Sequence, residues 1–146
     1  MEVTNKNLPL ILLVEDDPSD IELLLNRFKE GRLMNPITVV RDGLEAVSYL
    51  AGDPPYHERH IHPLPGIIIL DLKIPKMDGF EVLTWIRSRP KFERLPIVVL
   101  TSHGQDPMME RATACGAHAF LIKGVDTDGL VNLLQNTFLG WALIPV

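Results

Sequence analysis

The chain has 146 residues and one cysteine, so it is long enough for one domain with a hydrophobic core and has no internal disulfide. Hydrophobic residues make up 46% of the chain, too many for a disordered protein, and the net charge of −5 argues against a nucleic acid partner. No apolar stretch reaches the length of a membrane span and no basic, apolar leader opens the chain, so we expect a soluble cytoplasmic protein without a membrane partner.

Five short apolar segments predict β-strands, because each is rich in Ile, Leu and Val and is bounded by turn-forming residues. The expected strands are residues 10–14, 37–40, 66–70, 97–100 and 119–122. Their aliphatic residues do not alternate with polar ones, which is typical of strands buried on both faces of a parallel sheet.

The segments between the strands show helical spacing. The clearest apolar stripe is formed by Ile21, Leu24, Leu25 and Phe28. Asp17 suits the N-cap of that helix, Pro18 suits its first turn, and Gly31 is expected to end it. Further helices are expected near residues 44–50, 80–86, 108–115 and 125–138.

Strands that alternate with helices in this way predict an α/β fold of the flavodoxin-like, doubly wound (βα)5 type. Its five-stranded parallel sheet would have the order 2-1-3-4-5. The first and third strands are neighbours in that order, so their carboxyl ends meet at the point where such folds bind ligands. Glu15 and Asp16 follow the first strand and Asp71 follows the third. We therefore expect one acidic pocket.

This pocket has the composition of a phosphoryl-transfer site. Glu15, Asp16 and Asp71 are oxygen ligands of the kind that Mg²⁺ prefers, and uncompensated acids at this density require a cation. Lys123 follows the fifth strand and Thr101 follows residues 97–100, so both are expected on the same rim. A nucleophilic carboxylate, a metal ion and charge-neutralising donors are the parts that phosphoryl transfer needs.

With these residues in place, the chain resembles the receiver domain of two-component response regulators. The resemblance is carried, in order, by the motifs LLVEDD, ILDLKIPKMDG, VVLTS and FLIKG, and the receiver domain would cover residues 8–138. It implies a signalling phosphoacceptor that catalyses its own phosphorylation and dephosphorylation, not a metabolic enzyme. The phosphoryl group would come from a sensor histidine kinase.

The resemblance also assigns the metal ligands and the nucleophile. Asp71 is the phospho-accepting residue and a ligand to Mg²⁺. Asp16 binds the ion directly, Glu15 holds it through water, and the backbone carbonyl of Lys73 completes the protein ligands.

Three further residues acquire roles in the switch. Thr101 hydrogen-bonds the phosphoryl group, and Phe120 is the aromatic residue that turns inward when Thr101 moves. Lys123 pairs with Asp71 before phosphorylation and with the phosphoryl oxygens afterwards.

The chain departs from the family pattern at two positions. Gly124 stands where the family usually has proline after the lysine, and glycine removes the backbone constraint that a proline would impose beside Lys123. Lys73 places a long cationic side chain two positions after the nucleophile, where we expect it to modulate the lifetime of the acyl phosphate.

Two segments suggest a narrower resemblance, to single-domain regulators paired with bacterial phytochromes. Residues 51–65 form an enlarged, proline- and histidine-rich connection, and residues 139–146 form an apolar C-terminal tail. Such regulators are commonly dimeric, so the tail predicts a homodimer contact, with docking onto its own domain as the alternative. The partner kinase would then sense light. We expect no output domain after the receiver.

Three alternative functions share parts of this pattern. A phosphohydrolase of the haloacid-dehalogenase type requires a second Asp where this chain has Lys73. A flavodoxin-like FMN protein requires a phosphate-binding loop where this chain has Glu15 and Asp16. A receiver that acts as a docking module without phosphorylation is the remaining alternative.

Several other residues have simpler interpretations. Solvated loop histidines explain His57, His60 and His62 better than a metal site, and the same holds for His103 near the pocket mouth. Asp78 is expected to form a turn before Gly79, and Cys115 to be buried at a helix end.

Overall fold

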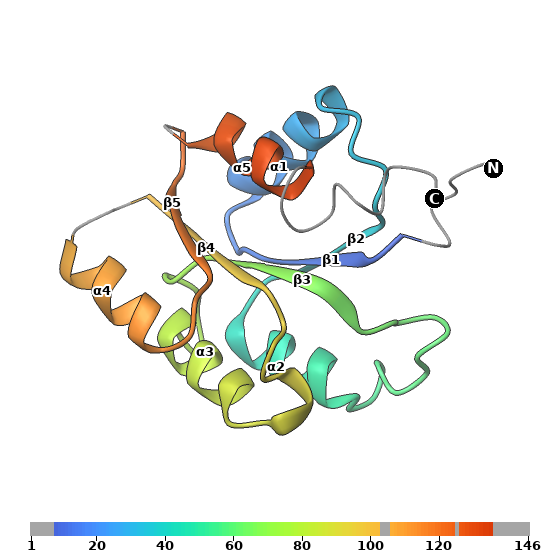
Figure 1. The fold of residues 1–146 in the computed structure, drawn as a ribbon. Helices are drawn as coiled ribbons and strands as arrows, with labels where there is room; N and C mark the ends of the chain where they lie inside the picture. Colours follow the sequence, from blue (N-terminus) through green and yellow to red (C-terminus); the bar gives the residue numbers. More distant parts are fainter. Residues whose placement is uncertain (1–7, 103–105, 125, 136–146) are drawn as a thin grey trace.

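The structure is a computed structural model that describes residues 8–102, 106–124 and 126–135. Its centre is one five-stranded parallel sheet with the order β2-β1-β3-β4-β5 (Figure 1). The strands are β1 (Leu10–Val14), β2 (Ile37–Val40), β3 (Pro65–Leu70), β4 (Ile97–Thr101) and β5 (Ala119–Ile122). The helices are α1 (Pro18–Glu30), α2 (Gly43–Ala51), α3 (Gly79–Arg87), α4 (Asp106–Ala114) and α5 (Thr127–Leu133), with a short 3₁₀ helix, η2 (Pro90–Phe92), after α3. The predicted fold and strand order are confirmed.

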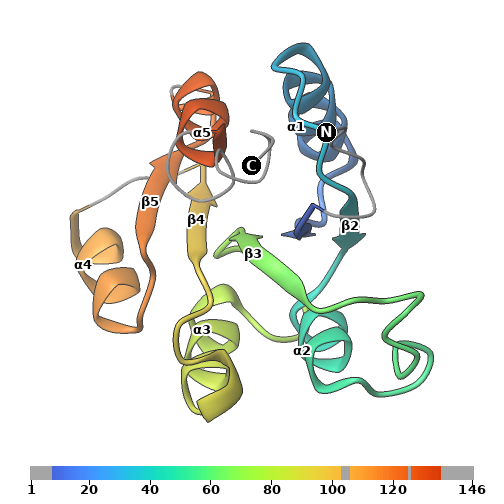
Figure 2. The ribbon, with the colours of Figure 1, turned by 45° about the vertical axis from the view of Figure 1, so that its right-hand side comes forward.

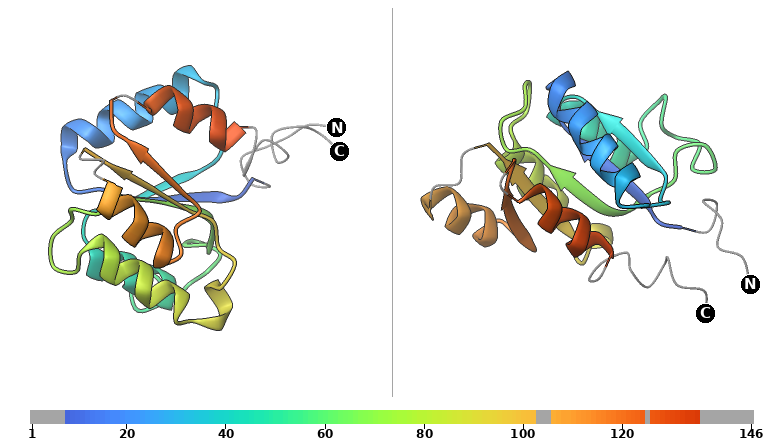
Figure 3. Two further views of the ribbon diagram at one scale, coloured as in Figure 1. Left: turned by 60° about the vertical axis from the view of Figure 1, so that its left-hand side comes forward. Right: turned by 90° about the horizontal axis from the view of Figure 1, so that it is seen from above.

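The helices form a layer on each face of the sheet. Helices α1 and α5 cover one face, and α2, α3 and α4 cover the other (Figures 1 and 3). Along β1, Ile11 and Leu13 pack with α1 and α5, whereas Leu12 and Val14 pack with α2 and α3. Burial of successive residues in opposite clusters explains why the strands are continuously aliphatic. At the β5 edge of the sheet stands α4 (Figure 2).

The ends of α1 have different physical causes. Asp17 caps the helix as predicted, since its Oδ1 accepts hydrogen bonds from the backbone N–H groups of Ser19 at 2.8 Å and Asp20 at 3.2 Å. Gly31 ends the helix, but its φ of −77° needs no glycine. A Cβ at Gly31 would lie 2.6 Å from Cγ1 of Val131, so close packing of α1 against α5 is what requires a glycine there.

Helix α5 (Thr127–Leu133) lies within the predicted range of 125–138 and starts later than predicted, and residues 134–135 continue it as a π-helical turn. The start is later because the carboxylate of Asp126 accepts a hydrogen bond from Ile122 N–H at 2.8 Å, and does not cap α5. Phe138 and the apolar tail lie outside the described residues. None of the described helices has the length and apolar character needed to cross a bilayer.

The enlarged connection between α2 and β3 is anchored to α2 by Arg59. Its guanidinium donates to the backbone carbonyls of Tyr49 at 2.8 Å and Leu50 at 2.9 Å, at the end of the helix. Tyr49 in turn donates to the carbonyl of Pro63 at 2.8 Å. His62 lies edge-on to Tyr49, with ring centroids 6.0 Å apart. The segment is therefore a structured extension of α2, and no metal-ligand cluster of the described residues includes its histidines.

Replacing Arg59 with alanine should destabilise the domain, because the last carbonyls of α2 lose their charged donor. We expect the free energy of unfolding in urea to fall by about 1–3 kcal/mol. Arg94→Ala, at an exposed arginine, is the matched control and should change it by less than about 0.5 kcal/mol. Equal effects of the two substitutions would contradict the anchoring role.

Candidate functional site

The acids expected to form one pocket do converge. Val14 pairs with Leu70 at the ends of β1 and β3, and the backbone N–H of Asp71 donates to the carbonyl of Val14 at 3.1 Å. This parallel register places Glu15 and Asp71 side by side. One carboxylate oxygen from each of Glu15, Asp16 and Asp71 lies within 4.8 Å of the others. Glu15 is 1% exposed and Asp71 7%, whereas Asp16 lies at the surface. The cluster is therefore buried on one side and open on the other.

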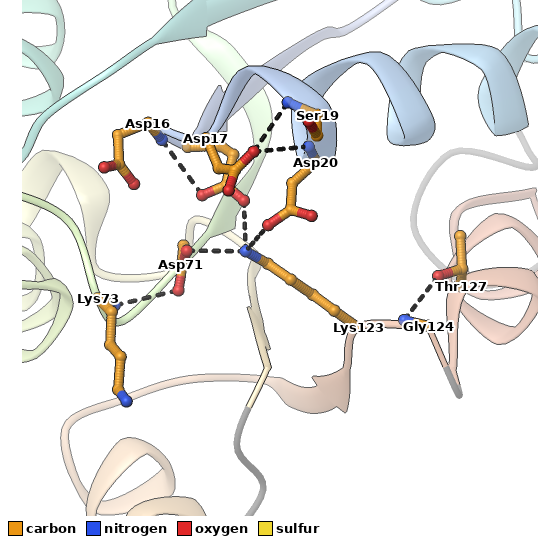
Figure 4. A network of polar contacts seen from close by, with 10 residues as sticks. Asp16, Asp17, Ser19, Asp20, Asp71, Lys73, Lys123, Gly124 and Thr127 are labelled. Atoms are coloured by element: carbon orange, nitrogen blue, oxygen red, sulfur yellow. Dashed lines mark hydrogen bonds and ion pairs between the residues drawn. The ribbon is translucent and has the colours of Figure 1, made fainter.

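Lys123 reaches this cluster from the end of β5. Its backbone N–H donates to the carbonyl of Thr101 at 2.8 Å, which fixes the start of the side chain on the rim. Its ammonium donates to Oδ2 of Asp71 at 2.9 Å, to Oδ2 of Asp20 at 2.8 Å and to Oε1 of Glu15 (Figure 4). An ammonium has three N–H donors, so all three are used.

The charges in the pocket are unbalanced. Burial, with the hydrogen bond to Asp71, raises the pKa of Glu15 from an ordinary 4.5 to about 9, although Lys123 opposes the shift. Burial also acts to lower the pKa of Lys123, but its hydrogen bonds to Asp20, Asp71 and Glu15 outweigh this and leave the pKa above its usual value. The hydrogen bond from Lys123 lowers the pKa of Asp20. One lysine does not neutralise these carboxylates, and the oxygen-only donor set of Glu15, Asp16 and Asp71 suits a hard divalent cation.

The two oxygens of Asp71 are held from different directions. Oδ1 accepts the backbone N–H of Lys73 at 3.0 Å, and Oδ2 accepts the ammonium of Lys123 at 2.9 Å. The Lys73 side chain is exposed and points away from the carboxylates (Figure 4). Lys73 therefore contacts Asp71 through its backbone N–H, and the effect of its side chain on the lifetime of the acyl phosphate stays a prediction.

The turn that carries Lys123 is held without a proline. Gly124 has φ +81°, a left-handed conformation that glycine adopts without strain. Its N–H donates to Oγ1 of Thr127 at 3.2 Å. Asp126 closes the turn twice on Ile122: its carboxylate accepts the N–H of Ile122, and its own N–H donates to the carbonyl, each at 2.8 Å. In place of a proline, these bonds fix the turn that carries Lys123.

Thr101 and Phe120 lie on the two strands beside the pocket. Thr101 is the last residue of β4, is fully buried, and pairs with Ile122 of β5. Phe120 is half-buried and packs against the cluster on the α2, α3 and α4 face. Thr101 therefore ends β4 at the rim that carries Lys123, and Phe120 lies on the neighbouring strand, while the switch roles of both stay predictions.

One residue of the site was missed from the sequence. Asp20 lies in the first turn of α1 and was treated as part of the helix, yet its carboxylate enters the pocket (Figure 4). No local sequence signal identified it, because its role depends on Lys123, which is more than a hundred positions away.

Other acids and neighbours have structural roles. Asp78 caps α3 by accepting the N–H of Glu81 at 2.9 Å, so it is not a metal ligand. Cys115, just after α4, is only partly buried. His103 lies outside the described residues.

Comparison with known proteins places this site in a family context. Residues 11–135 match the family model of the response regulator receiver domain. The response regulator Rcp1 of Synechocystis sp. is 34% identical over 133 residues, which cover 90% of this chain and 88% of Rcp1. The crystal structure of the Mn²⁺-bound form of Rcp1 has a TM-score of 0.79 to this chain at 30% identity and covers 94% of it and 99% of Rcp1.

Two other solved structures are similarly close. The phosphorylated cyanobacterial phytochrome response regulator RcpA has a TM-score of 0.80 at 30% identity, with 95% of this chain and 99% of RcpA covered. The bacteriophytochrome response regulator AtBRR has a TM-score of 0.79 at 38% identity, with the same coverage of 95% and 99%. Each similarity spans nearly the full length of both chains.

The raised pKa of Glu15 predicts how the metal-free protein responds to pH. The folded state keeps a proton on Glu15 that the unfolded chain releases, so the free energy of unfolding should fall as the pH rises from 4.5 toward 9. The pKa of Lys123 is raised above its usual 10.5 and the pKa of Asp20 is lowered below its usual 3.8. Both groups therefore keep their charges in the folded and unfolded states over this pH range, and neither adds to the pH dependence.

Glu15→Gln should flatten this pH dependence. In EDTA and above neutral pH, we expect the variant to be more stable than wild type by about 1–3 kcal/mol, measured by urea unfolding. The gain is smaller than the full linkage because Gln also removes the charged acceptor to which the Lys123 ammonium donates. Parallel pH profiles for the two proteins would contradict the assignment.

Proposed function

Because the chain belongs to the response regulator receiver family and is similar to phytochrome-associated response regulators, we propose that Asp71 accepts a phosphoryl group from a histidine kinase in a Mg²⁺-dependent reaction. One observation carries the proposal: the carboxylate of Asp71 is fixed by Lys73 N–H on Oδ1 and Lys123 on Oδ2, inside the acidic cluster. The nucleophile is thereby oriented before any donor arrives.

The metal ligands follow from the same cluster. Asp16, Asp71 and the backbone carbonyl of Lys73 would hold Mg²⁺, with Glu15 acting through water, and the bound ion would neutralise the carboxylates and the incoming phosphoryl oxygens. The Mn²⁺-bound form of Rcp1 supports a divalent cation at this position. A bound cation would also favour the ionised form of Glu15, against the burial that raises the pKa of this carboxyl.

The transfer itself needs no further protein group. A carboxylate oxygen of Asp71 forms the new P–O bond while the P–N bond of the kinase phosphohistidine breaks, and the departing imidazole nitrogen keeps the bonding electrons and takes a proton. The ammonium of Lys123 then passes from Asp71 to a phosphoryl oxygen, and the hydroxyl of Thr101 donates to another. Water later cleaves the acyl phosphate, so the chain catalyses its own dephosphorylation.

We assign the output to the β4–β5 side of the domain. Movement of Thr101 toward the phosphoryl group would free space for Phe120 to turn inward, which would change the surface at α4, β5 and α5. We propose that a homodimer forms in response, with the apolar residues 139–146 contributing to its contact. RcpA and AtBRR are phytochrome regulators, which supports a light-sensing histidine kinase as the upstream partner.

Intact-mass analysis after incubation with acetyl phosphate and Mg²⁺ tests the proposal. Wild type should gain the mass of one phosphoryl group, and Asp71→Asn should gain none because its amide is not nucleophilic. Asp78→Asn, which keeps the N-cap of α3, is the matched control and should behave as wild type. Modification of Asp71→Asn would place the phosphoryl group on another residue, and no modification of wild type would leave a docking module without phosphorylation as the better description.

Light scattering on the same samples tests the output. Phosphorylated wild type should shift toward the mass of two chains, whereas Thr101→Ala should accept the phosphoryl group and show no shift. An unchanged mass for wild type on phosphorylation would exclude self-association as the phosphorylation-dependent output.

A further inference from the structure

Asp20 contributes a carboxylate to the pocket that is neither in the metal-ligand cluster nor the nucleophile. Its Oδ2 lies 2.8 Å from Nζ of Lys123, and the contact is partly shielded, with side-chain exposures of 32% for Asp20 and 14% for Lys123. It belongs to the first turn of α1, and its own N–H donates to the Asp17 carboxylate. The carboxylate therefore rests on a capped helix end.

The other two acceptors of Lys123 have competing duties under the proposed function. Glu15 is needed by the water shell of the metal ion, and Asp71 becomes the phosphorylated residue. Once both are engaged, Asp20 is the acceptor that remains from the three. A lysine side chain has four flexible methylene groups, so without a fixed acceptor its ammonium would sample many positions.

We propose that Asp20 is a positioning residue for phosphoryl transfer. It keeps one N–H of the Lys123 ammonium engaged throughout the cycle, so that a second N–H stays directed at the phosphoryl group on Asp71. The inference rests on the proposed function, because it gives Lys123 a task that exists only if Asp71 is phosphorylated. It adds a carboxylate on α1 to the groups that orient the reaction.

Phosphorylation kinetics with acetyl phosphate separate positioning from simple charge. Asp20→Ala should lower the maximal rate about 5- to 20-fold while the half-saturating acetyl phosphate concentration changes less than about 2-fold. Asp20→Asn keeps an oxygen acceptor and should recover to within about 3-fold of wild type. Glu22→Ala, at an exposed acid on the same helix, is the control and should match wild type.

Two results would overturn the proposal. If Asp20 acted through its charge alone, the Ala and Asn substitutions would have equal effects. Both would lower the half-saturating acetyl phosphate concentration, because the pocket would carry less negative charge. If Asp20 had no role, both variants would match wild type. Asp71→Asn is run in parallel as the unphosphorylated control. If wild type itself is not phosphorylated, the proposed function is wrong. If wild type is phosphorylated and both Asp20 variants react at the same rate, only the positioning role is wrong.

A readout independent of turnover is the ¹⁵N-detected ammonium signal of Lys123 in protein loaded with Mg²⁺ and beryllofluoride, a stable phosphoryl mimic. Wild type and Asp20→Asn should give a narrow signal because exchange with solvent is slow, and Asp20→Ala should broaden it beyond detection. Lys123→Arg identifies the resonance. A narrow signal in Asp20→Ala would overturn the proposal even if its rate were reduced, and urea unfolding shows whether the variant is folded.

Discussion

The hydrogen-bonded group formed by the Lys123 ammonium and the carboxylates of Glu15, Asp20 and Asp71 is the interaction on which the rest of the structure depends. It joins the ends of β1, β3 and β5 to the first turn of α1, so a single lysine links four elements of the fold. One ammonium faces three carboxylates, and burial, with the hydrogen bond to Asp71, raises the pKa of Glu15. Under the proposed function, a pocket with this charge deficit would bind a divalent cation first and a phosphoryl group next, since each step would add a group that the remaining charges can bind.

The order of the strands in the sheet makes this arrangement of charged groups possible. Strand order 2-1-3-4-5 places β3 between β1 and β4, so the acids leave adjacent strand ends and Lys123 approaches from the edge. Two apolar clusters, one on each face, hold those strand ends in register. The carboxylates of the pocket lie at the carboxyl edge of the sheet, where Asp16 is open to water while Glu15 and Asp71 are not. The packed core therefore fixes the relative positions of the carboxylates in the site.

Much of this could be predicted from the sequence because the signals are local. Apolar runs that end in Glu15 or Asp71 show both the strand and its polar terminus, and the crossover rule then brings those termini together. Asp20 could not be predicted in this way, since its role depends on the direction of α1 relative to Lys123, more than a hundred positions away. The same limit applies to Arg59, whose target is a set of backbone carbonyls, and to Gly124, whose turn is closed by Asp126 and not by a proline. The direction of the Lys73 side chain could not be predicted for a related reason: residues two apart in a loop have no fixed relative orientation.

The central claim is that the cluster of Glu15, Asp16 and Asp71 is a divalent cation site whose charge deficit drives the chemistry. Calorimetric titration with Mg²⁺ tests it most directly, with Asp17→Asn as the control because Asp17 caps α1 and is not part of the cluster. Wild type and Asp17→Asn should each bind one ion per chain, and Asp16→Asn should bind at least about 10-fold more weakly because it loses a charged ligand. Equal affinity in all three proteins, or no binding in wild type, would contradict the account.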